Sequence, residues 1–250
     1  MQSLILILSI FVSSFLIHFG FRFYGYTIQY AQKRSVIFTE KDAKIYSPKL
    51  DADNYPSELE KLNSLCATKK CFLNLPTYFT SDEQLFVYQE NINQYQHLGN
   101  EEIKSSDELK TAVPEVLGLR DFIVKYPNAK GLLQVNADRP NINIKLIPIL
   151  AENNYYSSFV ICSEFGNLLR NLREQKPHWS TCASMDELTK AHMMSSIYLE
   201  SLAPMPSEYY YVPQKMINKL SKKFYEEIQR RNLFFIAPAT SPVKPSFTLR

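Results

Sequence analysis

The sequence predicts an α/β fold, a (β/α)8 barrel of the TIM type, preceded by an N-terminal membrane-spanning helix. Short apolar runs alternate with helical segments from residue 27 onward, and about seven or eight runs can be counted. An almost unbroken apolar segment opens the chain. We therefore expect an anchor or signal segment (1–26), a barrel (27–237) and a proline-containing tail (238–250). A doubly wound open sheet shows the same alternation and is the alternative.

The N-terminal segment Leu4–Phe21 is 18 residues long and is broken only by serines, one glycine and one histidine. This length is near the minimum for a helix that crosses a bilayer core of about 30 Å. A cleaved signal peptide is the second interpretation, although a basic start and a small-residue cleavage site are missing. A buried core helix is the third. We expect a single-pass membrane protein, secreted if the segment is cleaved; Arg22, Lys33 and Arg34 weakly favour a cytoplasmic C-terminal side.

Net charge and cysteine spacing argue against two classes of function. The net charge is +3 and no run of Lys or Arg exceeds two residues, so nothing indicates nucleic-acid binding. The four cysteines lack CxxC spacing, which argues against a zinc site. A disulfide between Cys66 and Cys71 is one interpretation of the close pair. Buried thiols are the expected state of Cys71, Cys162 and Cys182, which lie in or beside predicted strands.

The first part of the predicted barrel contains a strand, a turn and a strand. Ser35–Phe38 is the candidate first strand, and Pro56–Leu65 is expected to be a helix of the outer ring. Cys71–Leu75 is short and apolar, Thr80–Glu83 has turn chemistry, and Leu85–Tyr88 is apolar again. The polar stretch that follows, residues 91–102, predicts a loop.

The rest of the chain repeats a strand and a helix. Ser105 is a candidate N-cap for a helix to Ala112, with acidic residues in its first turn. A second helix is expected over Val113–Lys125, with one apolar face. Further strands are expected at Gly131–Asn136, Ser158–Cys162, His178–Cys182, Tyr209–Val212 and Leu233–Ile236. Further helices are expected at Asp138–Asn154, although Pro148 complicates that assignment, and at Glu164–Gln175, Met185–Ser195 and Pro213–Arg231. The basic side chains of the last helix form a solvated face or contact anionic lipid.

Residues 71–90 resemble the core signature of the glycerophosphodiester phosphodiesterase (GDPD) family, a branch of the PLC-like phosphodiesterase TIM barrels. In that family a strand ending Glu-x-Asp precedes a turn of Thr-x-Asp-Gly type, and the next strand ends in His-Asp. The segment Leu168-Leu169-Arg170-Asn171-Leu172-Arg173 is similar to a family helix of Leu-Leu-Arg-x-Leu-Arg type, and Tyr210–Pro213 to the seventh strand–helix unit. The resemblance implies a TIM barrel over residues 35–237.

Neutral residues stand at the positions that carry the family's chemistry. Asn74 and Pro76 match Glu-x-Asp, Gln89 matches the His of His-Asp, and Gln134 and Asn136 match a later Glu and Lys. The resemblance implies hydrolysis of a glycerol phosphodiester with Ca²⁺ or Mg²⁺, two histidines and three carboxylates. A hard cation prefers anionic oxygen ligands, and proton transfer to an alkoxide needs a group that titrates near neutral pH. We therefore expect a pseudoenzyme without a cofactor that binds a lipid or glycerophosphodiester ligand or acts as a scaffold.

An active phosphoric diester hydrolase of lipid metabolism, with relocated catalytic residues and Ca²⁺ or Mg²⁺, is the alternative. His97 and Glu90 are its candidate catalytic residues, together with Glu101 and Glu102 in the same polar loop. A solvated loop explains these charges equally well. Glu164 follows a predicted strand at the catalytic end, where it lines a pocket or interacts with the helix dipole.

Overall fold

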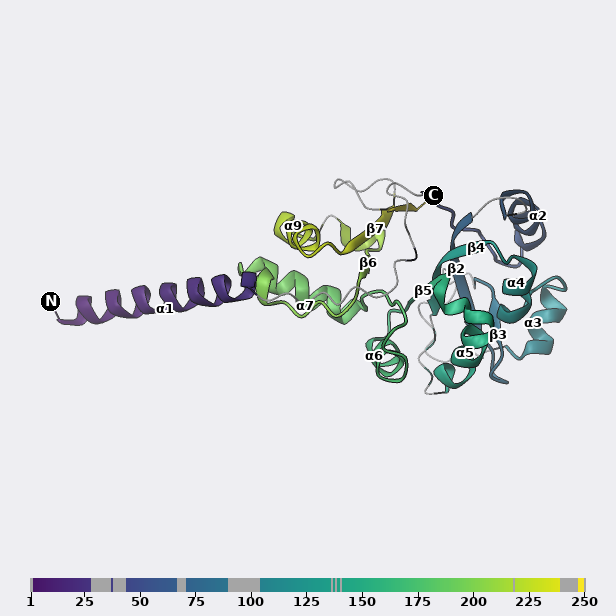
Figure 1. The fold of residues 1–250 in the computed structure, drawn as a ribbon, viewed down its shortest axis with the longest axis horizontal. Coiled ribbons are helices and arrows are strands. Elements are labelled where there is room, and N and C mark those ends of the chain that lie inside the picture. Colours follow the sequence, from purple (N-terminus) through teal and green to yellow (C-terminus); the bar gives the residue numbers. More distant parts are fainter. Residues whose placement is uncertain are drawn as a thin grey trace.

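The computed structural model describes residues 2–27, 37, 44–66, 71–89, 104–135, 137, 139, 141–217, 219–238 and 247–249. They form an α/β domain from which one helix, α1 (Gln2–Thr27), projects as a rod (Figure 1). The exposed fraction of large apolar side chains along α1 is 50% or more, as at Ile10, Phe15 and Phe23. At its C-terminal end α1 contacts the domain: a Cβ on Gly25 would lie 2.8 Å from the carbonyl carbon of Ser201.

No helix in the described part of the chain is long and apolar enough to cross a membrane. The expected span Leu4–Phe21 includes positions 4–6 and 8, whose side chains lie outside the described set.

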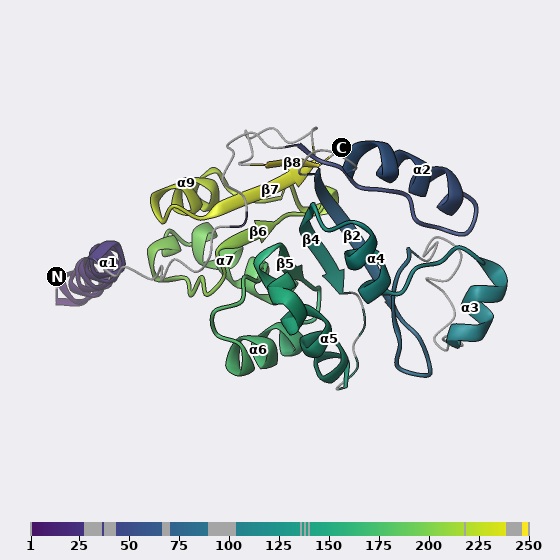
Figure 2. The same ribbon diagram turned by 45° about the vertical axis from the view of Figure 1, so that its right-hand side comes forward.

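The strands form two sheets of four strands each. The first sheet has the order β3 (Leu85–Val87), β2 (Cys71–Phe79), β4 (Ala129–Val135) and β5 (Phe159–Cys162). The second sheet has the order β1 (Lys44–Ile45), β8 (Phe247–Leu249), β7 (Phe234–Pro238) and β6 (Tyr209–Tyr211). All pairs are parallel except β2 with β3. Isolated parallel bridges join Tyr46 to Leu73, Ile161 to Thr181 and Cys182 to Tyr209. The arrangement is TIM-barrel-like, but continuous pairing among the described residues does not close the sheet (Figure 2).

Strands β2 and β4 are the centre of the first sheet, and their register positions the site. Asn74 pairs with Leu132, and Pro76 pairs with Gln134. Most residues of both strands are buried, as expected for parallel strands covered on both faces. Gly131 has φ 148°, and a Cβ there would lie 2.7 Å from the Leu73 nitrogen, so only glycine lets the two strands approach this closely.

Helices surround the sheets, and three of the described helices start at a serine whose side chain caps the first turn. Ser105 and Ser184 form capping boxes with Glu108 and Glu187, which fixes the starts of α3 and α7. The helices of the domain are α2 (Tyr55–Cys66), α3 (Ser106–Ala112), α4 (Leu119–Lys125), α5 (Ile142–Ala151), α6 (Gly166–Gln175), α7 (Met185–Ser196), α8 (Gln214–Ile217) and α9 (Lys222–Arg230), with the 3-10 helices η2 (Glu152–Ser157) and η3 (Glu200–Leu202).

Three expected helices are shorter than predicted. The helix expected over Val113–Lys125 begins only at Leu119, because the preceding residues bond to other segments; the Leu117 carbonyl accepts a hydrogen bond from Val87 N–H. The expected helix Pro213–Arg231 is split, since the Ser221 side chain caps a new helix, α9. The helix expected to reach Asn154 ends at Ala151, because Asn153 and Asn154 adopt left-handed φ angles of 49° and 59°.

Several expected strands also differ. The candidate first strand Ser35–Phe38 lies outside the described residues except for Ile37, and the first described strand is β1. In the segment His178–Cys182 only Thr181 and Cys182 pair, through isolated bridges. The tail contributes β8, which lies between β7 and β1 and pairs with both.

All four cysteines form disulfides, so the expectation of free buried thiols at Cys71, Cys162 and Cys182 is wrong. Cys66 pairs with Cys71, with 5.3 Å between Cα atoms, and Cys162 pairs with Cys182, with 4.7 Å between Cα atoms. Both separations lie in the range that a disulfide spans. The second pair is brought together by the bridge between β5 and Thr181, a tertiary contact that cysteine spacing does not reveal.

Candidate functional site

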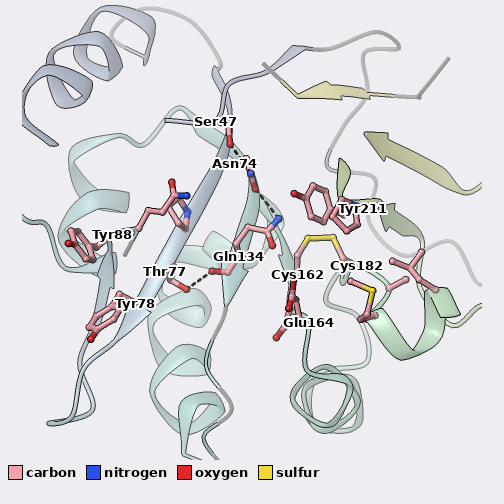
Figure 3. Close-up of a pocket in the computed structure, with 17 residues that line it drawn as sticks. Ser47, Asn74, Thr77, Tyr78, Tyr88, Gln134, Cys162, Glu164, Cys182 and Tyr211 are labelled. Atoms are coloured by element: carbon pink, nitrogen blue, oxygen red, sulfur yellow. Dashed lines mark hydrogen bonds between the residues drawn. A yellow bond between two sulfur atoms is a disulfide. The ribbon is translucent and has the colours of Figure 1, made fainter. Parts of the chain in front are cut away.

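A pocket of about 550 Å³ lies where several parallel strands end. Strands β2, β4, β5 and β6 contribute residues at or near their C-terminal ends, which is the end where TIM barrels carry their active sites. Figure 3 shows the lining residues converging from the two sheets. The polar and aromatic lining consists of Ser47, Asn74, Thr77, Tyr78, Tyr88, Gln89, Gln134, Ser163, Glu164 and Tyr211.

A chain of hydrogen bonds crosses one wall of the pocket. Asn74 Nδ2 donates to Ser47 Oγ at 2.9 Å, and Gln134 Nε2 donates to Asn74 Oδ1 at 3.0 Å. The hydroxyl of Thr77 donates to the backbone carbonyl of Gln134 at 2.8 Å. Figure 3 shows these side chains pointing toward one another from β2, β4 and the segment after β1. The amide groups of this wall are therefore engaged with one another in a neutral network.

The structure brings four of the predicted positions together. Asn74, Pro76, Gln89 and Gln134 all line the pocket, although they come from separate segments of the chain. The remaining predicted positions, Asn136, Glu90 and His97, lie outside the described residues, as do Glu101 and Glu102.

Sequence reasoning missed Ser47, Tyr211 and the Cys162–Cys182 disulfide as parts of the site. Ser47 follows the first strand, which was expected several residues earlier in the chain. A signal for Tyr211 was present, because it stands at the end of an expected strand, where TIM-barrel site residues occur.

The pocket contains one carboxylate among its described lining residues, Glu164, and no Lys, Arg or His. Tyr211 has a raised pKa, first because it is partly buried and so loses solvation, and second because Glu164 is negatively charged. The phenol of Tyr211 is therefore neutral and can donate a hydrogen bond at neutral pH. The site as described combines one negative charge with neutral donors and acceptors.

The described lining does not fit a divalent cation. Ca²⁺ and Mg²⁺ are bound by sets of oxygen ligands that include carboxylates, and Asn74 Oδ1 already accepts a hydrogen bond from Gln134. Pro76 has no side-chain ligand to offer. Within the described residues there is no group of three or more His, Cys, Asp or Glu that could hold a metal ion.

A second polar network supports the pocket from behind the disulfide. Arg173 of α6 donates from Nε to Thr181 Oγ1 at 2.8 Å and from Nη2 to the Cys182 carbonyl at 3.0 Å. The same guanidinium forms an ion pair with Glu187 of α7, and Arg173 is only 11% exposed. This network fixes the short 181–182 segment between β5 and β6, and with it the wall that carries Cys182.

Comparisons with known proteins found similarity in structure alone; no family model and no curated protein matches the sequence. The chain superposes on the crystal structure of a glycerophosphodiester phosphodiesterase from Parabacteroides distasonis with a TM-score of 0.58 and 11% identity, covering 84% of this chain and 94% of that one. A putative glycerophosphodiester phosphodiesterase from Galdieria sulphuraria gives a TM-score of 0.57 and 9% identity, with coverage of 87% and 94%. A third structure, a glycerophosphodiester phosphodiesterase from Agrobacterium tumefaciens, gives 0.54 and 12%, with coverage of 83% and 96%.

These similarities show the fold. The chain has the fold of the glycerophosphodiester phosphodiesterases, as a sequence that diverges strongly from theirs. The fold predicted from residues 71–90 and the later motifs is thereby confirmed at the level of a TIM-barrel-like α/β domain.

Proposed function

We propose that this GDPD-like domain is a pseudoenzyme that binds a ligand in its pocket and does not catalyse metal-dependent phosphodiester hydrolysis. The observation that carries the proposal is the neutral chain Ser47–Asn74–Gln134, with Pro76 beside it, at the strand ends where the fold holds its chemistry. The ligand class that the fold suggests is a glycerophosphodiester or a related lipid product. A fold alone does not determine activity, so the proposal depends on the residues of the site.

Charge explains why these residues disfavour a catalytic cation. Two unit charges 4 Å apart attract by about 4 kcal/mol at an effective dielectric constant of 20. Replacing several carboxylates by amides and a proline removes several such attractions at once. Glu164 alone leaves a hard cation with one anionic ligand from the described lining.

The proposal is tested by incubating the purified full chain with glycerophosphocholine and lysophospholipids in Ca²⁺ or Mg²⁺, with and without EDTA. An active GDPD enzyme assayed in parallel is the positive control. We expect no release of product above a blank without protein. Turnover that EDTA abolishes would overturn the proposal.

The same assay also tests the alternative function, which is phosphodiester hydrolysis by catalytic residues at positions other than those of the family. If the wild-type chain is active, His97→Ala and Glu90→Gln are compared with it. Loss of activity in either variant supports relocated catalysis, and unchanged activity in both refutes it.

Ligand binding is measured separately by calorimetry with intact glycerophosphocholine. Gln134→Ala removes the donor that holds Asn74 and is expected to weaken binding. Lys49→Ala, an exposed position outside the pocket lining, is the matched control and is expected to bind like wild type.

We also propose that α1 attaches the protein to a membrane as a single-pass anchor, once the apolar residues Leu4, Ile5, Leu6 and Leu8, whose side chains lie outside the described set, are counted as part of it. Its apolar side chains are exposed on all sides, and the domain covers only its C-terminal end.

The pairing of all four cysteines supports a domain on an oxidising side of that membrane, since disulfides persist outside the reducing cytosol. The weak charge bias of Arg22, Lys33 and Arg34 favours the opposite side, and we give the disulfides more weight because they concern the folded domain itself. Flotation with lipid vesicles tests the attachment, and thiol alkylation before and after reduction tests the pairing.

A further inference from the structure

Helix α7 connects the pocket to the opposite end of the domain. Met185 and Leu188, in its first turns, line the pocket. The helix has 12 residues and is therefore about 18 Å long. Its C-terminal end leads into η3, because Leu199 N–H donates to the Met194 carbonyl and the chain then turns. The two ends of α7 thus mark the pocket side and the far side of the domain.

The anchor helix α1 contacts the far side. Gly25, near its C-terminal end, packs against Ser201 of η3 so closely that a Cβ there would lie 2.7 Å from the Ser201 Cβ. Figures 1 and 2 show α1 leaving the domain from the end where α7 and α9 lie, away from β2 and β4. Strand β6 supports this polarity, since it starts after η3 and its last residue, Tyr211, lines the pocket.

The surface beside this contact combines exposed apolar and basic side chains. The exposed fractions are 63% for Met193, 55% for Ile197 and 52% for Tyr198, at the C-terminal end of α7. The start of α9 is held against that end: Ser221 Oγ lies 2.8 Å from Ser195 Oγ, and Lys223 Nζ lies 3.4 Å from the Tyr198 ring centroid. Lys222, beside it, is 89% exposed and pairs with Glu226 at 3.5 Å. We call Met193, Ile197, Tyr198, Lys222 and Lys223 the α7–α9 patch.

We propose that the α7–α9 patch rests on the lipid headgroups of the bilayer that holds α1, so that the pocket opens away from that membrane. Two features identify lipid as the occupant. The patch lies at the end of the domain where α1 is attached, since Ser201, which packs against Gly25 of α1, follows Tyr198 by three residues. Its mixture of an aromatic ring, aliphatic side chains and lysines is the composition that favours the membrane–water interface. The proposal rests on the membrane attachment proposed above.

This orientation specifies how a ligand reaches the pocket. A lipid in the anchoring bilayer lies at the far end of α7, about 18 Å from the pocket lining. The pocket therefore receives a water-soluble molecule, or one presented from a facing surface, and does not extract a lipid from its own membrane.

Tryptophan quenching by brominated lipids tests the orientation in the full chain. The protein has a single tryptophan, Trp179, which is 1% exposed and serves as an internal baseline. Tyr198→Trp and, as a second probe, Ile197→Trp place a reporter in the patch. Ile144→Trp is the matched control, because Ile144 is an apolar residue that is also more than half exposed (65%) and lies near the start of α5, which follows the pocket end of β4.

We expect loss of emission from both patch reporters in brominated vesicles, because the apolar side chains of an interfacial surface are buried about 5–10 Å into the headgroup–acyl boundary. The Ile144→Trp variant is expected to show only the baseline of wild type. Replacing Lys222 and Lys223 by Glu in the Tyr198→Trp background is expected to reduce the quenching in vesicles that contain phosphatidylglycerol, whereas Lys49→Glu leaves it unchanged.

The outcomes separate the two proposals. If the full chain floats with vesicles but neither patch reporter is quenched, or if Ile144→Trp is quenched as strongly, the orientation is overturned and the anchor stands. If the chain does not float, the anchor and the orientation both fail. Quenching confined to the patch reporters supports both.

Discussion

Substitution of Asn74 tests whether the neutral chain at the pocket wall is a real structural unit. Asn74→Ala removes the hydrogen bond from Nδ2 to Ser47 and the one that Oδ1 accepts from Gln134. Each hydrogen bond contributes about 0.5–1.5 kcal/mol net, so we expect the free energy of unfolding to fall by about 1–3 kcal/mol. Asn74→Asp keeps an acceptor for Gln134 Nε2, and the Ser47 hydroxyl can rotate to donate to the second carboxylate oxygen. We expect that variant to lose less than about 1 kcal/mol.

Urea unfolding of the full chain in detergent, followed by circular dichroism, measures both variants at one pH. The slope of the unfolding free energy against urea must match wild type for the comparison to be valid. The reasoning is refuted if Asn74→Asp loses as much stability as Asn74→Ala, or if Asn74→Ala is within about 0.5 kcal/mol of wild type.

Three further predictions concern the scaffold. Gly131→Ala, at φ 148° against Leu73, is expected to cost about 2 kcal/mol or more by thermal unfolding, whereas Gly20→Ala, with nothing within 4 Å of its Cβ position, is expected to be neutral or better. Cys162→Ser opens a disulfide loop with a sequence separation of 20 and is expected to lower the free energy of unfolding by about 3 kcal/mol. Cys66→Ser opens a loop with a separation of 5 and is expected to lower it by about 2 kcal/mol, because a shorter loop restricts the unfolded chain less; equal losses would contradict this dependence on loop length. Burial raises the pKa of Tyr55 to about 12, so its phenol ionises in the unfolded chain before it ionises in the folded one, and the free energy of unfolding should fall as the pH rises from 10 to 12. Tyr55→Phe should make that fall less steep, and an unchanged pH dependence would contradict the assignment.

Local sequence signals predicted the elements that depend on local chemistry. The N-cap at Ser105, the apolar strands β4 and β5, and the amphipathic helix α6 were all expected close to their observed positions. The four pocket positions Asn74, Pro76, Gln89 and Gln134 were expected from the resemblance to the GDPD motif, which places the family's site residues at these positions.

Features that depend on tertiary contacts could not be predicted. The pairing of Cys162 with Cys182 follows from the bridge of β5 to Thr181, and the start of α4 follows from hydrogen bonds between the Val113–Gly118 segment and β3. The division of the last long helix at Ser221 had a local signal, a serine N-cap, which the basic periodicity of residues 213–231 obscured. The role of Ser47 depends on where β1 lies, and no apolar run marks that strand.

The central claim is that the strand-end pocket has lost the ligands for a divalent cation. Equilibrium dialysis of the full chain against radioactive Ca²⁺ measures this directly, with an Asn74→Glu, Pro76→Asp, Gln134→Glu triple variant beside wild type. The account predicts that wild type binds no stoichiometric Ca²⁺ and that the triple variant gains affinity, because carboxylates then replace the neutral wall. One tightly bound Ca²⁺ per wild-type chain, displaced by EDTA, would contradict it.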